Sequence, residues 1–141
     1  MILQRDRRLN SNIQKYGCYF MSILWHINRL RNIALDDSVI ESFYEEAVRL
    51  GYMGETCWIK DPDGIFALGG LRTKYTQEHA PSTRVCADDE IEILKWVHPD
   101  GSPRSHFVAG DGLGNTTYDP WGVSRAATEG RLESKRIFKL V

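Results

Sequence analysis

The chain has 141 residues, of which 42% are hydrophobic and 26% are charged. This composition is typical of one ordinary globular domain and excludes a fibrous or largely disordered chain. Eighteen lysine and arginine residues are balanced by nineteen aspartate and glutamate residues, so the formal net charge is −1. A chain with so balanced a charge lacks the electrostatic attraction that usually holds proteins to nucleic acids or anionic membranes. We therefore expect a single domain over residues 1–141, with no nucleic-acid partner and no membrane partner.

The sequence also bears on the compartment of the protein. No apolar run approaches the roughly 18 residues that a membrane-spanning helix needs, and the first residues, Met1 to Arg8, lack the charged and then hydrophobic order of a signal peptide. We expect a cytoplasmic protein, with export by an uncleaved route and association with a virion as open alternatives. The three cysteines, Cys18, Cys57 and Cys86, are too few and too scattered to indicate a disulfide framework or a zinc site.

Hydrophobic periodicity predicts helices in the first half of the chain. From Cys18 to about Arg31, large apolar residues recur at steps of three and four, which is the stripe of an amphipathic helix. A second helix is expected from Asp37 to Leu50, where Ser38 to Glu41 fits a capping box and Gly51 supplies a stop. A shorter helix is expected between Asp61 and Gly70, with an acidic start and a glycine end.

Extended segments are expected to follow the helices. The polar, aperiodic stretch from Thr76 to Asp89 is predicted to be a loop or an irregular strand connection. Beyond it, turns rich in glycine and proline separate four predicted strands: Ile91–Val97, Ser105–Ala109, Thr116–Asp119 and Ser134–Val141. These strands are expected to form an antiparallel meander. Helices first and hairpin-linked strands second is the element order of an α+β domain.

Cys18, His106 and Asp119 form a candidate catalytic triad. A cysteine in the first turn of a helix lies near unpaired backbone N–H groups and the positive end of the helix dipole, which both favour the nucleophilic thiolate. A thiolate that attacks carbonyls needs an imidazole to move the proton and a carboxylate to orient that imidazole. His106 begins one predicted strand and Asp119 ends the next, so a hairpin can bring them together. The structural alternative is a core cysteine, a sheet histidine and a turn aspartate.

Other conspicuous residues favour structural roles. Asp61–Gly64 and Asp111–Asn115 are similar to fragments of calcium loops, but neither continues to the glutamate ligand that such loops need. We therefore expect no metal and no other cofactor. Cys57 and Cys86 have no histidine and aspartate in a fitting order and are interpreted as core or incidental residues. Trp58 is expected to pack in the core.

Three short segments carry a resemblance to a known family. They are a glutamine followed by Gly17-Cys18 and an apolar helix, the sequence Ser-His-Phe-Val-Ala-Gly at residues 105–110, and Tyr-Asp-Pro-Trp-Gly at residues 118–122. Together they resemble the papain-like cysteine peptidases, and within them the small branch related to bacteriocin leader peptidases. The resemblance implies Cys18 as nucleophile, His106 as general base and acid, and Asp119 as the residue that orients His106.

A glutamine ahead of the nucleophile would complete an oxyanion hole with the Cys18 backbone N–H. Gln14 is the nearer candidate in sequence. Gln4 is the alternative, because the phrase Gln-Arg-Asp that starts there is similar to one in some bacterial members. Trp121 directly follows the Asp-Pro pair and is expected to shield the imidazole from water. Trp121 and Gly17 are expected to contact the substrate.

We therefore predict an α+β, papain-like domain in which N-terminal helices, with the nucleophile at the start of the first helix, pack on a C-terminal antiparallel sheet. The resemblance implies a thiol hydrolase that cleaves an amide in a peptide or protein substrate: a peptide bond, an isopeptide bond or a glutamine carboxamide. A transferase, in which an amine resolves the thioester, is one alternative. A non-catalytic module of a virion or another complex is the second, and it predicts a buried, inert Cys18 and a working surface near Trp58 or Trp121.

Overall fold

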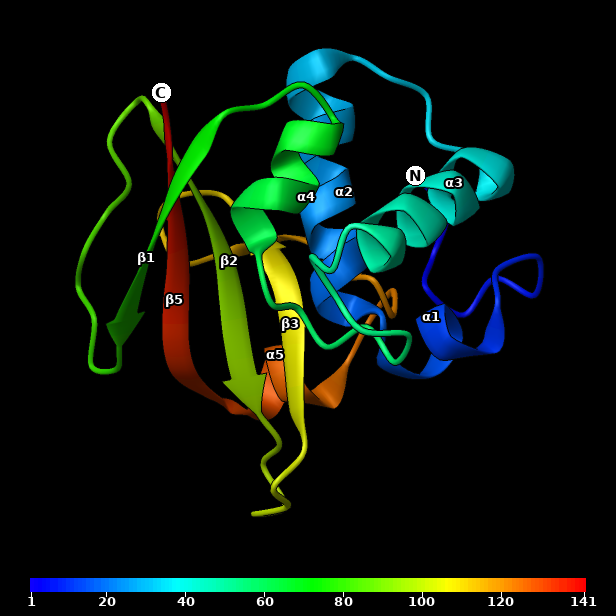
Figure 1. Ribbon diagram of the computed structural model, residues 1–141. Coiled ribbons are helices and arrows are strands. Elements are labelled where there is room, and N and C mark those ends of the chain that lie inside the picture. The colour runs from blue at the N-terminus through cyan, green and yellow to red at the C-terminus, as the bar shows by residue number, and fades with distance from the viewer.

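In the computed structural model, which describes residues 1–141, four helices precede the first strand and a fifth lies between the last two strands (Figure 1). The helices are α1 (Ser11–Tyr16), α2 (Cys18–Arg31), α3 (Asp37–Arg49), α4 (Pro62–Leu68) and α5 (Arg125–Glu129). The strands are β1 (Thr73–His79), β2 (Glu90–Val97), β3 (Ser105–Gly110), β4 (Thr116–Tyr118) and β5 (Arg131–Leu140). The predicted α+β class is confirmed. No helix combines the length and the hydrophobicity that crossing a membrane requires.

The five strands form one antiparallel sheet in the order β1-β5-β2-β3-β4. Only β2, β3 and β4 follow one another as in a meander. The last strand, β5, lies between β1 and β2 and pairs with both. The predicted simple meander is therefore wrong, because β5 pairs with β1 and β2 and not with β4.

β1 overlaps the stretch from Thr76 to Asp89, for which the sequence predicts a loop or an irregular strand connection. The prediction is wrong for the first residues of that stretch, which pair with Ile137 and its neighbours in β5. β1 is an edge strand, so only one of its sides forms ladder hydrogen bonds. None of its residues is buried, and charged side chains such as Lys74 and Glu78 are usual on an edge. Such a strand has no apolar signature to reveal it.

The helices of the first half lie close to their predicted bounds. α2 coincides with its prediction, and α4 has Asp61 as its N-cap and Gly69 as its C-cap. α3 also matches, but its N-cap is Asp36, whose carboxylate accepts the Val39 N–H at 2.9 Å. The predicted capping box at Ser38 is therefore not used. The short helices α1 and α5 were not predicted, and because α1 precedes α2, Cys18 begins the second helix rather than the first.

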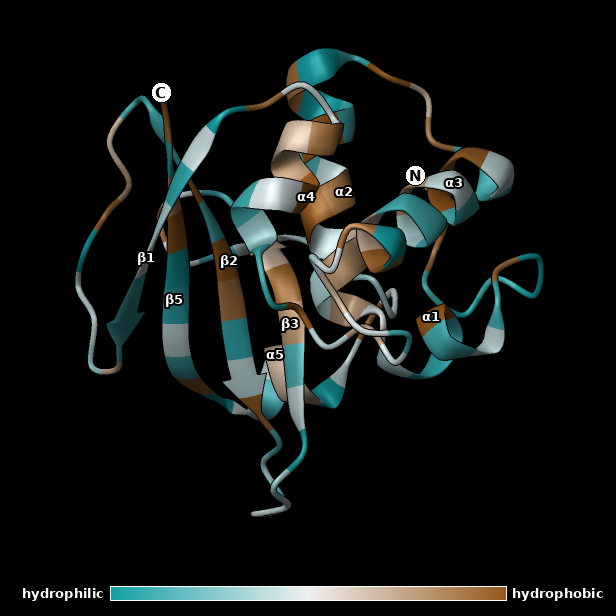
Figure 2. Cartoon of the chain, in the orientation of Figure 1, coloured by the Kyte–Doolittle hydropathy of each residue, from teal (hydrophilic) through white to brown (hydrophobic).

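The main hydrophobic cluster lies between the helices and one face of the sheet. α2 is its centre, with Phe20, Ile23, Leu24 and Ile27 fully buried. Hydrophobic residues are concentrated on α2 and on the central strands that face it, whereas β1 is mostly hydrophilic (Figure 2). This packing fixes the position of α2 against the sheet.

The second face of the sheet is also covered near its centre. Because side chains alternate along a strand, Leu94 and Ile137 point away from the face that carries Ile93 and Phe138, and they are fully buried as well. α5 contacts β2 and β3 and contributes the buried Ala126. The segment between β4 and β5 is thereby held close to the start of β3.

Candidate active site

Cys18 lies at the first position of α2, directly after a tight junction with α1. Gly17 forms this junction, and its N–H donates to the Ile13 carbonyl at 2.9 Å. A Cβ at Gly17 would lie 2.5 Å from that carbonyl oxygen, so only glycine fits. The Cys18 side chain is partly exposed, and the N–H groups of its turn have no acceptor inside the helix. The local fold therefore presents a partly exposed thiol at the positive end of a helix.

Two polar side chains inside the core attach α2 to the sheet. The Ser22 hydroxyl lies 2.8 Å from the Cys18 carbonyl oxygen and 3.5 Å from the Phe107 carbonyl oxygen. One turn further on, His26 Nε2 donates to the Glu92 carbonyl at 2.8 Å. The Tyr19 ring also stacks on the Phe107 ring with 4.5 Å between centroids. These contacts hold the start of α2 against the start of β3, where His106 lies.

His106 and Asp119 are brought together by the β3–β4 hairpin, as their spacing predicts. His106 Nε2 lies 2.6 Å from Asp119 Oδ1, and their side chains are 11% and 6% exposed. Asp119 also accepts the Trp121 N–H at 2.9 Å and the Ser124 hydroxyl at 2.6 Å. Three donors converge on this carboxylate, so it is the acceptor and Nε2–H is the donor. The other imidazole nitrogen, Nδ1, is left for Cys18.

The protonation of His106 reflects these neighbours. Burial lowers its pKa, but the Asp119 carboxylate and the Cys18 side chain both raise it, and the result is a pKa of about 9. Burial raises the pKa of Asp119, but its hydrogen bonds with His106 and Ser124 outweigh this effect and hold the pKa below its usual value. At neutral pH the ring is therefore a cation beside an ionised carboxylate, which is the state that can stabilise a thiolate.

A cavity of about 660 Å³ opens beside these residues; its lining includes Cys18, His106, Gln4 and Trp121, and we call it the His106 cavity. Gln4 is 3% exposed. Its backbone N–H donates to the Pro120 carbonyl at 2.9 Å, and its Nε2 donates to the Gln14 carbonyl at 3.1 Å. A side-chain amide has two N–H bonds, so one of them has no protein acceptor and can serve a ligand in the cavity.

The structure distinguishes the two glutamines that the sequence left open. The Gln14 side chain donates to the Leu9 carbonyl at 2.6 Å, and Gln14 does not line the His106 cavity. Gln4 lies far from Cys18 in sequence but reaches the same cavity. The loop before α1 returns the chain to the turn after β4, a contact that no local sequence pattern reveals. Ser124, which supports Asp119, was likewise missed because a lone serine carries no signal.

The two residues expected to contact substrate differ in placement. Trp121 is 38% exposed and lines the His106 cavity, with the Arg5 guanidinium 5.1 Å from its ring centroid. Gly17 is buried behind Cys18 and does not line that cavity. The expectation that Trp58 packs in the core is wrong, because its side chain is 74% exposed. It lines a second cavity that Cys18 also lines.

The other two cysteines are poor candidates for a nucleophile. All three cysteines are free thiols. Burial raises the pKa of Cys57 to about 12 and the pKa of Cys86 to about 12. Both are therefore protonated and poorly nucleophilic at neutral pH, in keeping with their interpretation as core or incidental residues.

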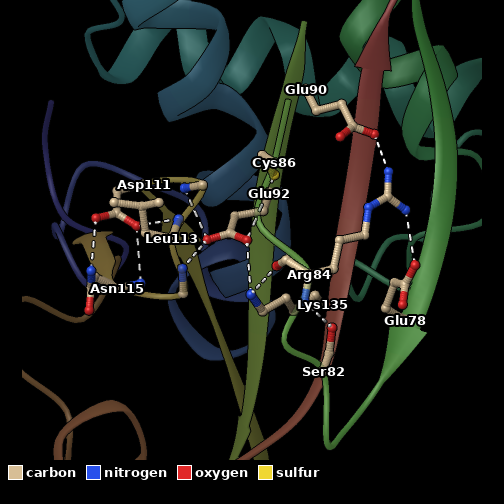
Figure 3. Close-up of polar contacts among 12 residues, drawn as sticks. Glu78, Ser82, Arg84, Cys86, Glu90, Glu92, Asp111, Leu113, Asn115 and Lys135 are labelled. Atoms are coloured by element: carbon tan, nitrogen blue, oxygen red, sulfur yellow. Dashed lines mark hydrogen bonds and ion pairs between the residues drawn. The ribbon is translucent and has the colours of Figure 1, made fainter. Parts of the chain in front are cut away.

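A second cluster of charged residues lies on the face of the sheet opposite α2 (Figure 3). The Glu92 carboxylate is fully buried and accepts N–H groups of Gly112 at 3.0 Å and Gly114 at 2.8 Å. Lys135 Nζ lies 3.6 Å from this carboxylate and donates to the Arg84 carbonyl at 2.8 Å. Each partner is satisfied, so the cluster fastens two loops to the sheet and leaves no group free for a ligand. No group of three or more histidine, cysteine, aspartate or glutamate side chains is arranged to hold a metal ion.

One comparison with known proteins places the chain in a family. A family model described as "Protein of unknown function, DUF261" matches residues 1–140. The chain belongs to this family. Comparisons with curated proteins and with solved structures give no match. The DUF261 match covers every helix and strand and includes Gln4, Cys18, His106 and Asp119.

Proposed function

We propose that this DUF261 protein is a papain-like thiol hydrolase that cleaves an amide, with Cys18 as nucleophile, His106 as general base and acid, and Asp119 as the residue that orients His106. One observation carries the proposal. Residues that are distant in sequence converge beside one cavity, as a nucleophile at a helix N-terminus, an imidazole, and a carboxylate 2.6 Å from that imidazole. A cysteine that only fills the core does not require an imidazole and a carboxylate beside it.

The first half of the proposed reaction forms a thioester. The Cys18 thiolate attacks the carbonyl carbon of the amide, and the carbonyl electrons move to oxygen. The Cys18 backbone N–H and the free Gln4 N–H stabilise this oxyanion. The protonated His106 gives its proton to the leaving nitrogen, the C–N bond breaks, and an amine or ammonia departs.

The second half releases the acyl group. Water attacks the thioester carbonyl and gives a proton to His106. The second oxyanion collapses, the C–S bond breaks, and a carboxylic acid leaves while Cys18 regains its thiolate. Asp119 keeps the imidazole in one orientation through both steps, with Trp121 N–H and Ser124 holding Asp119 in turn. A peptide bond, an isopeptide bond and a glutamine carboxamide are the amides that this reaction accommodates.

Cys18→Ala tests the nucleophile. The native protein is incubated with a peptide library prepared from a whole proteome, and mass spectrometry reads new chain ends and conversion of glutamine to glutamate. We expect Cys18→Ala to lower either activity by about 10⁴-fold or more, as the loss of a nucleophile does in other hydrolases. Cys86→Ala is the matched control and is expected to retain activity. Turnover that persists in Cys18→Ala would overturn the proposal.

Alkylation separates the hydrolase from the non-catalytic module. The native protein is treated with iodoacetamide, and peptide mass spectrometry follows each cysteine. We expect Cys18 to react far faster than Cys57 and Cys86, whose protonated thiols are buried or half-buried. A Cys18 that reacts only after denaturation would instead support a non-catalytic module.

A further inference from the structure

A second cavity adjoins the His106 cavity, and the two share Lys15, Tyr16, Cys18 and Ser105 as lining residues. It has a volume of about 600 Å³, and we call it the Tyr19 cavity. The lining residues that bear on its chemistry are Lys15, Cys18, Tyr19, Lys95, Phe107 and Arg136. Cys18 also lines the His106 cavity, so a bound chain could extend from the reacting carbonyl into both cavities.

The Tyr19 cavity carries three cationic side chains and no acidic one. The cations are Lys15, Lys95 and Arg136. Lys95 is paired with Glu133 at 3.2 Å, but Glu133 does not line the cavity. Lys15 and Arg136 form no ion pair with any carboxylate of the chain. The cavity therefore presents positive charge that the protein itself does not neutralise.

Arg136 is held in place although it lacks an anionic partner. Its guanidinium carbon lies 4.8 Å from the Phe107 ring centroid and 5.6 Å from the Tyr19 ring centroid. Its Nη1 donates to the Ser134 hydroxyl at 2.5 Å. Burial raises the pKa of Tyr19, so the phenol stays neutral and does not cancel the guanidinium charge. An arginine fixed in this way is organised for an anion before the anion arrives.

The position of Arg136 relates it to the reacting groups. The two rings beneath it belong to Tyr19 and Phe107, which directly follow Cys18 and His106 in the chain. The arginines of the His106 cavity differ, because Arg104 is paired with Asp100 at 3.3 Å and Arg125 with Glu129 at 2.7 Å. The unpaired Lys15 lines both cavities, whereas the unpaired Arg136 lines the Tyr19 cavity alone.

We infer that the Tyr19 cavity binds a carboxylate of the peptide substrate close to the amide that Cys18 attacks, with Arg136 as its main partner. This inference rests on the proposed function and names its substrate class as acidic peptides. Arginine binds a carboxylate through two parallel hydrogen bonds, and the aromatic rings exclude water from one side of that contact. The carboxylate can belong to an aspartate or glutamate side chain or to the end of a chain, since both present the same group.

Chloroacetyl peptides built on alanine test the inference without a known substrate. The Cys18 thiolate attacks the chloroacetyl methylene, a C–S bond forms, and chloride leaves with the C–Cl electrons. One set carries glutamate at successive positions before a C-terminal amide, a second carries glutamine instead, and a third ends in a free carboxylate. We expect the best carboxylate probe to modify Cys18 about tenfold faster than its neutral counterpart, as one charge-assisted contact would give.

Variants assign the preference to the Tyr19 cavity. The readout is the ratio of anionic to neutral probe rates within each variant, so a general change in Cys18 reactivity cancels. Arg136→Gln is expected to lower this ratio to the value measured for the denatured chain. Arg136→Glu reverses the charge at this position, so it is expected to react faster with an additional probe that carries lysine in place of glutamate. Arg131→Gln is the matched control, because Arg131 is exposed on the same strand and lines neither cavity. If the Arg136 variants do not fold, Lys95→Gln replaces them as the test, because it should also lower the ratio of anionic to neutral probe rates.

The outcomes separate the two proposals. A preference for glutamate within amide-ended probes identifies a side-chain carboxylate, and a preference for free-acid probes alone identifies a chain end. If Cys18 reacts rapidly but equally with acidic and neutral probes, or if Arg136→Gln keeps the preference, the carboxylate inference is wrong and the nucleophile stands. If no probe modifies Cys18 in the native protein, the proposed function fails, and the inference fails with it.

Discussion

Asp119 determines the charge of His106, and this link can be measured directly. Asp119→Asn removes the carboxylate that helps to raise the pKa of His106 to about 9. We expect the pKa of His106 to fall by about one to three units, the usual effect of losing a close opposite charge. NMR titration of the four histidine rings, with His106 assigned by its absence in His106→Gln, measures the shift.

The same substitution should slow the alkylation of Cys18 at neutral pH, because a neutral imidazole stabilises the thiolate less. Asp89→Asn is the matched control, since Asp89 is an exposed carboxylate far from the cavity and its only ion pair is with Lys139 at 4.0 Å. An unchanged titration of His106 in Asp119→Asn would show that the carboxylate does not set the charge of the ring.

Gln4 and Gln14 are distinguished by the step that each variant affects. Gln4→Ala removes the free N–H from the His106 cavity, and we expect the hydrolysis of amides to fall by about 10²-fold to 10³-fold. Alkylation of Cys18 creates no oxyanion and should fall much less. Comparing the two rates in Gln4→Ala and Gln14→Ala tests the assignment. If Gln14→Ala loses as much hydrolysis as Gln4→Ala, the oxyanion hole is formed differently.

Site residues could be predicted from the sequence where a pattern among neighbouring residues marked them, and could not be predicted where no such pattern existed. The stripe after Cys18 and the hairpin between His106 and Asp119 can be read from neighbouring residues. Gln4 could not be chosen over Gln14, because the contact between its backbone N–H and Pro120 spans almost the whole chain. The role of a side chain is predictable when its position depends on one element, and unpredictable when it depends on the meeting of two distant segments.

At the scale of elements, the junction between α1 and α2 controls the position of the nucleophile. In Gly17→Ala the new Cβ would lie 2.5 Å from the Ile13 carbonyl oxygen and 2.9 Å from Ile13 Cγ2. One of the two helices must move, and we expect a loss of about 1–3 kcal/mol of unfolding free energy, as overpacking usually costs. Denaturant unfolding measures the loss, and the alkylation rate of Cys18 reports the displaced helix start.

Gly54→Ala is the matched control for this junction. The nearest atom to a Cβ at Gly54 is Trp58 Cβ at 3.9 Å, an ordinary contact, so its unfolding free energy should change by less than about 0.5 kcal/mol. Equal stability of Gly17→Ala and Gly54→Ala would mean that the junction is looser than its packing indicates.

The elements that were missed share a physical reason. α1 has a single buried residue, Ile13, and β1 has none, so neither shows the hydrophobic period from which elements are predicted. α2, β2 and β3 are central, and their buried residues made them predictable. The strand order was also unpredictable, because the pairing of β5 with β2 instead of β4 joins segments that are distant in sequence.

At the scale of the whole molecule, two histidines give the stability opposite dependences on pH. His106 has a folded pKa of about 9, above the ordinary value of 6.5. Its folded form binds more protons than the unfolded chain between these values, so its stabilisation is complete below the lower one and is lost as the pH rises through about 9. Burial lowers the pKa of His26 from 6.5 to about 4. The unfolded chain then binds more protons in that interval, so stability falls as the pH drops through it.

These two effects together predict a maximum of the unfolding free energy near pH 6.5, the value at which both histidines titrate in the unfolded chain. Urea unfolding at a series of pH values from about 4 to about 10 measures the curve, and its alkaline limb should fall by up to about 3 kcal/mol. His106→Gln should remove most of this limb and leave the acid limb in place, because His26 lies eight residues after Cys18 in α2 and bonds to the Glu92 carbonyl of β2 instead of to the His106 site. An alkaline limb that survives in His106→Gln would show that another group dominates it, and a flat acid limb in the native protein would show that buried His26 accepts a proton without cost. Urea unfolding of Asp119→Asn tests whether the candidate site causes the alkaline limb. Loss of the carboxylate should lower the pKa of His106, and the alkaline fall in unfolding free energy should shift toward neutral pH with it.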